Sequence, residues 1–271
     1  MKLKFLGTAA AEGWPALFCQ CDACRRARRL GGKNIRTRSS CLIDEEYMVD
    51  FSADTYMHVL NEGLDLTKVK HLIITHSHED HFYPSDLMMR RQPFAYMDKP
   101  EPLTIYGNDK VQSCFDAVNG ARNDNILIFR QVRAYEPFSA GEAVITPLLA
   151  DHSPEEQCFV YVIELNGKKL LYGHDSGYFP ETTWEVLRNY MLDGVVLDCT
   201  SGPQSCEHYH MGLPQDIKVK ERLLEQASAG DNTIFIINHF SHNGGLLYDQ
   251  LVETAAPHNF KVTYDGMEIE I

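Results

Sequence analysis

The sequence predicts an α+β fold with four layers, in which two β-sheets pack face to face and helices cover the outer face of each sheet. Short apolar runs typical of strands occur near both ends of the chain, at residues 2–7 and 267–271, and helix-like segments are interleaved with further runs. No heptad pattern or long Ser, Gly or Pro linker interrupts the series. Because 271 residues, 44% of them hydrophobic, can bury a full core, we expect one domain over residues 1–271.

The expected strands are apolar runs that end at turn-forming residues. Between the two terminal runs they are residues 41–43, 47–50, 72–75, 103–106, 126–129, 144–149, 159–165, 169–173, 194–198, 233–238 and 261–264. Asn166 and Gly167 separate two of these runs and predict a tight hairpin. Asp265 and Gly266 predict a second hairpin near the C-terminus.

The expected helices lie between the strands, at residues 54–62, 84–91, 109–118, 181–190, 214–227 and 245–255. Pro214 falls in the first turn of one of them and Gly230 after its last turn, the usual asymmetry of helix ends. Helices interleaved with strands in this way favour the four-layer αβ/βα sandwich.

The composition limits the partners. The formal net charge is −13, from 38 acidic against 25 basic residues, and phosphate-backbone binding draws its affinity from Lys and Arg, so we expect no large nucleic acid partner. The chain contains no run of eighteen apolar residues, and the apolar run at residues 3–6 is too short for a signal-peptide core. The sequence therefore predicts a cytoplasmic protein without membrane contact.

The most informative segment is His-Ser-His-Glu-Asp-His at residues 76–81, directly after an apolar run. Few arrangements besides a metal centre need three neutral imidazoles and a carboxylate in so little space. His76 and His78 stand two apart and can face one ion. Asp80 and His81 can turn toward a second ion beside it.

Further candidate ligands stand where other apolar strands end. They are His152, Asp175 and His239. His174 precedes Asp175, and adjacent strand residues point in opposite directions, so one of the two should face the ions. We choose Asp175 because a carboxylate can bridge two metals.

This ordered set resembles the metallo-β-lactamase superfamily of binuclear hydrolases, and the resemblance implies that superfamily's sandwich fold and two divalent ions, Zn or Mn. By the resemblance the first ion is held by His76, His78 and His152, the second by Asp80, His81 and His239, and Asp175 bridges them. Asp50 matches the buried aspartate that orients a ligand histidine in this superfamily. An aspartate that simply starts a turn is the alternative at that position.

Cys19, Cys21 and Cys24 fall within six residues, one thiolate short of a closed structural zinc site. His242 is our choice for the fourth ligand of one structural zinc. The segment GTAAAEGWPALFCQCDACRRAR resembles the N-terminus of the PhnP cyclic-phosphate phosphodiesterases, which close a similar loop with a His shortly after the last catalytic ligand. Members of that group also suggest a homodimer.

His210 stands in a His-Met-Gly context after the strand at residues 194–198. By resemblance to the phosphodiesterase branches it reaches over the metals to the phosphate, and His208 is the competing candidate. The expected reaction is hydrolysis of a small phosphodiester, such as a cyclic ribose phosphate, by a metal-bridging hydroxide. His210 would donate a proton or hydrogen bond, while Asp80 would serve as ligand and hold the nucleophile in line.

Three alternatives stay open. A lactonase or thioesterase would use the same ions on a carbonyl carbon. A transfer-RNA processing nuclease shares the motif, but such enzymes carry a long basic arm where only residues 153–174 separate His152 from Asp175. The N-terminal pattern also resembles PqqB, a superfamily member from quinone-cofactor biosynthesis.

Overall fold

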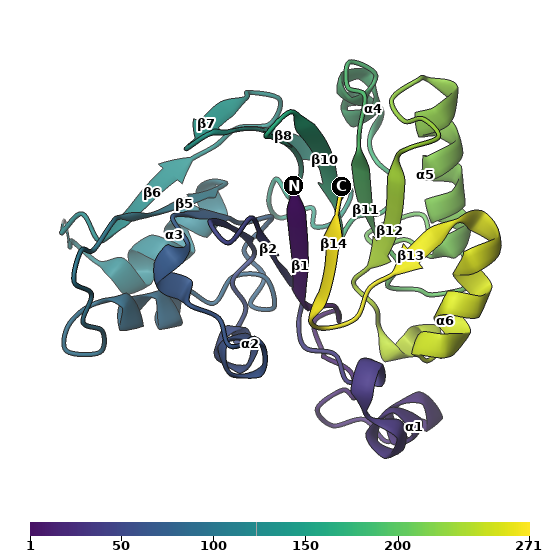
Figure 1. Cartoon of the computed structure of the whole chain (residues 1–271), viewed down its shortest axis with the longest axis horizontal. Coiled ribbons are helices and arrows are strands. Elements are labelled where there is room, and N and C mark those ends of the chain that lie inside the picture. Colours follow the sequence, from purple (N-terminus) through teal and green to yellow (C-terminus); the bar gives the residue numbers. More distant parts are fainter. Residues whose placement is uncertain (123) are drawn as a thin grey trace.

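The computed structural model describes residues 1–122 and 124–271, and within them the chain forms two seven-stranded sheets (Figure 1). The first has the order β14-β1-β2-β3-β4-β5-β6, with β1 Lys2–Gly7, β2 Ser40–Ile43, β3 Tyr47–Val49, β4 His71–Ile73, β5 Leu103–Gly107, β6 Leu127–Gln131 and β14 Met267–Glu270. The second has the order β13-β12-β11-β10-β9-β8-β7, with β7 Phe138–Ala140, β8 Ala143–Leu149, β9 Phe159–Leu165, β10 Lys168–Gly173, β11 Gly194–Asp198, β12 Ile234–Asn238 and β13 Phe260–Val262.

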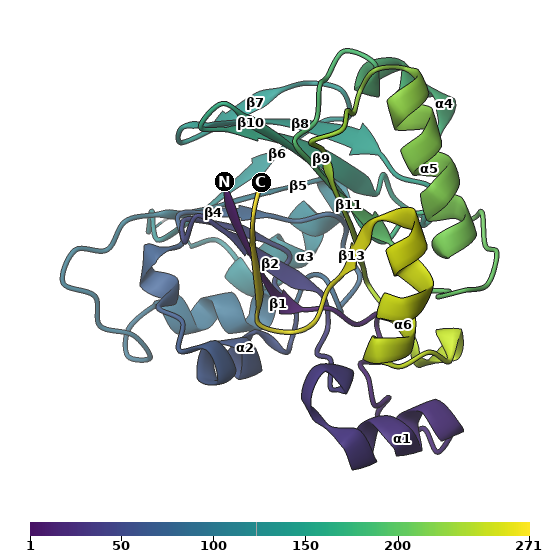
Figure 2. The same ribbon diagram turned by 45° about the vertical axis from the view of Figure 1, so that its right-hand side comes forward.

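The helices are α1 Asp22–Leu30, α2 Thr55–Glu62, α3 Asp109–Asn119, α4 Glu181–Leu187, α5 Leu213–Glu225 and α6 Tyr248–Ala255. Helices α4, α5 and α6 cover the outer face of the second sheet, and α2 and α3 lie against the first (Figure 2). The predicted four-layer α+β sandwich is therefore confirmed. Short 3₁₀ segments complete the chain, among them η3 Pro84–Arg90 and η4 His242–Gly244.

The middle of the sandwich is filled by side chains from the facing sides of both sheets. Phe5 and Ile73 of the first sheet pack in one cluster with Tyr161, Tyr172 and Val196 of the second, and all five are at most 1% exposed. Strands β10 and β11 are apolar on their other face as well, because helices cover it. Burial on both faces is why these strands read as continuous apolar runs in the sequence.

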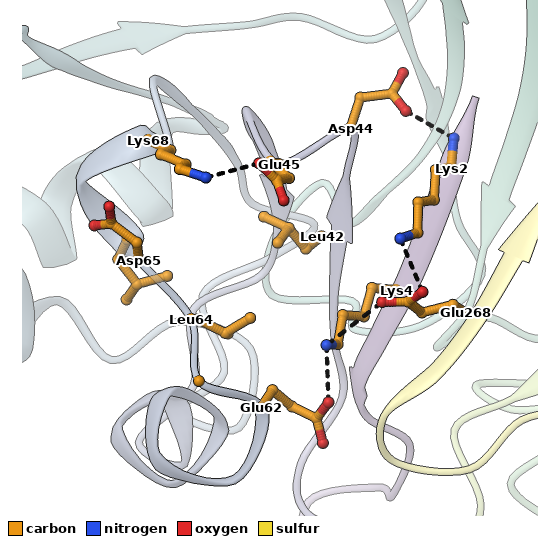
Figure 3. A pocket seen from close by; sticks show the side chains of 12 residues that line it. Lys2, Lys4, Leu42, Asp44, Glu45, Glu62, Leu64, Asp65, Lys68 and Glu268 are labelled. Carbon is orange, nitrogen blue, oxygen red and sulfur yellow. Dashed lines mark hydrogen bonds and ion pairs between the residues drawn. The ribbon is translucent and has the colours of Figure 1, made fainter.

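The two termini lie side by side (Figure 1). The final strand β14 leaves the second half of the chain and pairs antiparallel with β1, and the Ile271 amide donates to the Met1 carbonyl at 3.1 Å. Beside them a cavity of about 180 Å³ opens between β1, β14 and α2 (Figure 3). Its lysines pair with acidic neighbours, as Lys4 does with Glu62 and Glu268, and the five acidic residues that line the cavity outnumber its three lysines.

The structure corrects several sequence-based boundaries. Asn166 and Gly167 do form a hairpin, both with positive φ, between β9 and β10. The second predicted hairpin is wrong, because β13 pairs with β12 and β14 pairs with β1 in the other sheet. Asp265 instead accepts hydrogen bonds from Thr8 and Thr37. The segment expected as a helix at residues 84–91 is the 3₁₀ segment η3.

Helix α1 was not predicted from the sequence. It carries four arginines in nine residues, so its apolar signal is weak, and only Ala23, Cys24 and Ala27 are buried. It projects from the body of the molecule together with the cysteine loop (Figures 1 and 2).

Within the described residues 1–122 and 124–271, no helix is both long and apolar enough to cross a membrane.

Candidate metal centre

The parallel strands of both sheets end at one edge of the sandwich, and the predicted site residues follow these ends. β4 runs parallel to β3, and β10, β11 and β12 are parallel to one another. Asp50, Asp175 and His239 come directly after or soon after their strands with φ of 62°, 52° and 62°. A left-handed residue turns the chain sharply, which costs about 1–2 kcal/mol for a side chain other than glycine. Strain of this kind concentrates at functional sites.

The first group comprises His76, His78, His152 and Asp175, whose ligand atoms all lie within 4.8 Å of one another. His76 Nε2 is 2.9 Å and His152 Nε2 is 3.2 Å from His78 Nδ1. Asp175 Oδ2 is 3.3 Å from His76 Nε2 and 3.4 Å from His152 Nε2. The structure thus gathers these four predicted side chains, which come from three loops.

The second group comprises Asp80, His81, Asp175 and His239, again within 4.8 Å. His81 Nε2 is 3.1 Å from Asp80 Oδ2, 3.0 Å from Asp175 Oδ2 and 3.3 Å from His239 Nε2. Asp175 therefore belongs to both groups, as a bridging ligand would. His174, the neighbour that we did not choose, points away and its Nε2 lies 2.9 Å from Asp50 Oδ2.

The donor atoms fit divalent cations. Nitrogen and oxygen ligands about 2.1 Å from a tetrahedral ion stand about 3.4 Å from each other, close to the spacings in both groups. Where Nδ1 carries the proton, as its outer contacts favour at His81 and His239, the two Nε2 atoms 3.3 Å apart both present lone pairs and cannot bond to each other. Asp175 Oδ1 and His210 Nδ1 are buried and lie 3.0 Å apart as an ion pair, but within the described residues neither atom makes a hydrogen bond. A cation bound between these nitrogen and oxygen atoms would accept their lone pairs.

Four of the histidines have Nδ1 occupied from outside the cluster, which leaves Nε2 free to face an ion. His81 Nδ1 lies 2.6 Å from Asp50 Oδ2, and His152 Nδ1 lies 2.9 Å from the Tyr209 carbonyl. The other two contacts are His76 Nδ1 to Thr75 Oγ1 at 3.0 Å and His239 Nδ1 to Thr200 Oγ1 at 2.8 Å. Such outer contacts fix the tautomer and orientation of metal-binding imidazoles.

Two buried aspartates stand behind the second group. Asp50 accepts from the Thr75 amide and hydroxyl, and Asp198 accepts from the Thr200 amide and hydroxyl. Asp198 Oδ2 also lies 3.2 Å from His239 Nδ1. Burial opposes the charge of both carboxylates, but the facing histidines outweigh it and hold the pKa of each well below its usual range.

The pKa values of the candidate ligands are likewise set by burial and by the neighbouring charges. Burial, reinforced by neighbouring imidazoles, holds the pKa of His76 well below its usual value, which keeps this side chain neutral as a ligand must be. The pKa of Asp175 is also well below its usual range, because the surrounding histidines outweigh the cost of burial. Asp175 is therefore an anion at the centre of the site.

His210 lies beside the bridging aspartate, whereas His208 does not. His210 Nδ1 is 3.0 Å from Asp175 Oδ1 and 3.7 Å from Asp198 Oδ2. Burial lowers its pKa, but these two carboxylates outweigh burial and raise the pKa of His210 to about 11. The His208 side chain is 80% exposed and pairs with Asp151 at the rim.

A cavity of about 410 Å³ opens over the cluster. His78, His152 and His210 line it together with Asp80 and Asp175, so the candidate ligands are accessible to a small molecule. Its remaining wall comes from the segments that follow β1, β11 and β12.

Cys19, Cys21, Cys24 and His242 form a separate group within 4.8 Å. His242 Nδ1 lies 3.4 Å from Cys21 Sγ and 3.7 Å from Cys19 Sγ. Backbone amides donate to all three sulfurs, each at 3.4 Å. These contacts lower the pKa of Cys21 to about 6 against the effect of burial, whereas burial raises the pKa of Cys24 to about 12. Three thiols and one imidazole fit a structural zinc ion.

Sequence reasoning missed three residues of the site. Asp198 ends a predicted strand, as Asp50 does, and that position was the available signal. Glu156 accepts from the Ser77 amide at 3.1 Å and from its hydroxyl at 2.7 Å, so it holds the His76–Ser77–His78 loop. Glu12 lines the cavity. Nothing in the local sequence distinguishes Glu12 or Glu156 from other glutamates.

The model of the Beta-lactamase superfamily domain family matches residues 48–240, which is most of the chain and runs from within β3 to just past His239. The chain belongs to the metallo-β-lactamase superfamily. Membership confirms the resemblance drawn from the motif and places the chain among the metallo-hydrolases, a class that works with divalent metal ions.

Solved structures share the fold over the full chain. A diphosphatase from the PhnP family is 21% identical with a TM-score of 0.76, covering 100% of this chain and 96% of that one. Zinc-bound PqqB from Methylobacterium extorquens is 16% identical with a TM-score of 0.74, covering 100% of both chains. The short form of human tRNase Z is 17% identical with a TM-score of 0.67, covering 100% and 99%. At these identities the likeness concerns the fold.

One curated relative matches in sequence. Ribonuclease Z of Leuconostoc mesenteroides is 32% identical over 110 residues, which is 40% of this chain. The match spans only 30% of that protein's length.

Proposed function

We propose that the protein, as one domain over residues 1–271, is a binuclear metal-dependent phosphodiesterase that hydrolyses a small phosphodiester, with a cyclic ribose phosphate as one candidate. The observation that carries the proposal is the position of His210, 3.0 Å from the aspartate shared by both ligand groups and inside the cavity above them. A proton donor next to a candidate two-ion site suits a substrate whose oxygens gain negative charge as the reaction proceeds.

The two groups described above would hold the ions, Zn or Mn, and the cysteine group would hold a structural Zn. When bound, the two ions would supply positive charge to phosphoryl oxygens and activate water for attack. Asp175 brings the two groups together, and Asp80 lies at the cavity wall where it could align the attacking water.

His210 has the role of donor in this proposal. It would give a hydrogen bond or proton to a phosphoryl or leaving-group oxygen. The carboxylates of Asp175 and Asp198 lie 3.0 and 3.7 Å from its Nδ1, which leaves the rest of the ring free for substrate. A third of its side chain remains exposed at the cavity.

A nuclease is the second candidate, because the curated sequence relative is a ribonuclease Z. Two features favour a small substrate instead. The net charge is −13, and β9 and β10 join His152 to Asp175 through a two-residue turn rather than a long arm.

The test is a substrate panel run on protein with measured metal content. The panel contains bis(p-nitrophenyl) phosphate, a 2′,3′-cyclic nucleotide, a lactone, a thioester and a precursor tRNA. We expect turnover of the small diesters. Turnover of the lactone or thioester alone, of the tRNA alone, or of nothing by fully loaded protein would contradict the proposal, and the last result would favour a PqqB-like biosynthetic role.

A further inference from the structure

Apart from Ala10 and Ala11, the cavity wall that does not hold metal is polar, and it carries one acidic side chain. Glu12 comes from the segment after β1, Ser201 and Gln204 come from the segment after β11, and Ser241 and Asn243 follow β12. No Lys, Arg, Phe, Tyr or Trp side chain lines this cavity among the described residues. The wall therefore suits hydroxyl groups better than a second phosphate or a stacked base.

The backbone around Glu12 is fixed. Gly13 donates to the Ala10 carbonyl at 3.0 Å and has φ of 69°, so the segment is a tight turn. Ala10 donates to the Phe240 carbonyl at 3.1 Å, which ties the turn to the residue that follows His239. Arg38 donates to the Ala11 carbonyl at 2.8 Å. Glu12 is thus presented to the cavity by a turn bound at several points.

The carboxylate of Glu12 is held through one oxygen. Its Oε1 accepts from the Ser241 hydroxyl and lies 3.6 Å from His242 Nε2. The other ring nitrogen of His242, Nδ1, faces the cysteine sulfurs. His242 therefore lies between the cysteine group and Glu12 at the cavity wall. The second oxygen, Oε2, makes no hydrogen bond within residues 1–122 and 124–271, and the side chain is 31% exposed. Because Glu12 lines the cavity, a carboxylate with one unengaged oxygen stands at the cavity wall.

We propose that Glu12 is a specificity-determining residue, whose carboxylate accepts hydrogen bonds from substrate hydroxyls and disfavours substrates that carry a second phosphate. The inference rests on the proposed phosphodiesterase function. It names the substrate class as a phosphodiester with a neutral, hydroxylated organic part. An ionised acceptor binds a hydroxyl strongly, and it repels an anion in the same place.

The test compares wild-type protein with Glu12→Gln on three substrates. Ribose 2,3-cyclic phosphate has free hydroxyls, its 5-phosphorylated form adds an anion, and bis(p-nitrophenyl) phosphate has neither. We expect Glu12→Gln to lose about tenfold in kcat/KM on the first substrate, mainly through KM, because a charged hydrogen bond is weakened. It should gain on the 5-phosphorylated form and stay within twofold on bis(p-nitrophenyl) phosphate.

Two controls accompany the variant. Glu155→Gln removes the same charge from an exposed glutamate in the loop after His152 and should match wild type on all three substrates. Metal content is measured for each protein, and rates are compared at equal content. Calorimetric titration with ribose 3-phosphate gives a readout without turnover, and we expect about tenfold weaker binding to Glu12→Gln.

The outcomes separate this inference from the proposed function. If wild type hydrolyses bis(p-nitrophenyl) phosphate, the phosphodiesterase function is supported. If Glu12→Gln then changes the rate by the same factor on all three substrates, the proposed role of Glu12 is wrong. A wild-type preference for the 5-phosphorylated substrate overturns it as well. If wild type hydrolyses no diester, both fail.

Discussion

At the scale of the residue, the site is built from carboxylate–histidine pairs. Asp50 faces His81 and Asp198 faces His239, and a threonine hydroxyl donates to each carboxylate. Both aspartates are completely buried. A buried anion against Nδ1 keeps the proton on that nitrogen, so that Nε2 presents its lone pair to the cluster.

Replacing Asp198 with Asn tests this arrangement. The amide keeps the size of the side chain and can still accept from the amides of Thr200 and Met211, but its NH₂ group would face the Nδ1 proton of His239. The histidine would then favour the other tautomer. We expect about 10- to 100-fold weaker metal binding at the second group, measured by chelator competition, with the cysteine zinc unchanged. Unaltered affinity at both sites would contradict the orienting role.

The two loop histidines make a matched pair. His210→Ala should lower kcat on bis(p-nitrophenyl) phosphate by about 10²–10⁴-fold with metal content intact, because the donor is lost and the ligands remain. His208→Ala, at the exposed rim, should change kcat less than twofold. Loss of metal from His210→Ala would show that this side chain is a ligand instead.

At the scale of the element, α3 supports the His76–Ser77–His78 loop. Asn108 caps α3 by accepting from the Val111 amide at 2.8 Å and donates to Glu156 Oε2 at 2.7 Å. The other oxygen of Glu156 holds Ser77. Hydrogen bonds therefore link the start of α3 through Glu156 to the loop that carries His76 and His78.

Glu156→Ala should therefore weaken metal binding at the first group by about tenfold, because His76 and His78 would lose a fixed backbone. Chelator competition measures the affinity. Glu136 and Glu156 line one surface cavity, so Glu136→Ala is the control and should bind metal as wild type does. Equal affinities for both variants would show that the loop needs no such support.

The cysteine loop and α1 form a second unit at this scale. Cys21 caps α1 by accepting from the Cys24 amide, and serine can make the same cap. We expect Cys21→Ser to have a lower melting temperature and one zinc fewer per chain. Because serine keeps the cap, the lower melting temperature would come from loss of the metal. An unchanged melting temperature and zinc content would rule out a structural zinc at this loop.

Elements were predictable from the sequence where their pattern is local. The buried strands, such as β9 and β11, read as apolar runs because both of their faces are covered, and the ligand motif is contiguous. Helix α1 buries only Ala23, Cys24 and Ala27 and carries four arginines, so no apolar run marks it in the sequence. The residues Asp265 and Gly266 have the sequence of a hairpin turn, but the strands on either side of them pair with distant strands: β14 pairs with β1 and β13 with β12. Glu12 and Glu156 act through contacts far away in sequence, which no local signal reveals.

At the scale of the whole molecule, stability should depend on pH through His58. This histidine is 1% exposed on α2, its Nε2 lies 2.8 Å from Thr37 Oγ1, and burial lowers its pKa from 6.5 to about 4. The unfolded chain therefore binds a proton at a higher pH than the folded chain does. The stabilisation from neutral His58 is full above about pH 6.5 and is lost as the pH falls toward 4.

His58→Gln keeps a hydrogen-bond donor and does not titrate. Between pH 7.5 and pH 5 we expect wild type to lose about 2 kcal/mol more of its unfolding free energy than the variant loses. Denaturant unfolding of both proteins, in chelator so that the metal centre contributes equally, measures the difference. Parallel pH profiles would show that His58 is not the titrating group.

The central claim is that loops from both sheets gather side chains around a pair of cations. Elemental analysis of purified protein, for wild type and for His76→Ala with His81→Ala, tests it most directly. We expect two ions at the paired groups plus one zinc at the cysteines in wild type, and the zinc alone in the double variant. Wild-type protein that binds no metal beyond the cysteine zinc, even after incubation with zinc or manganese, would contradict it.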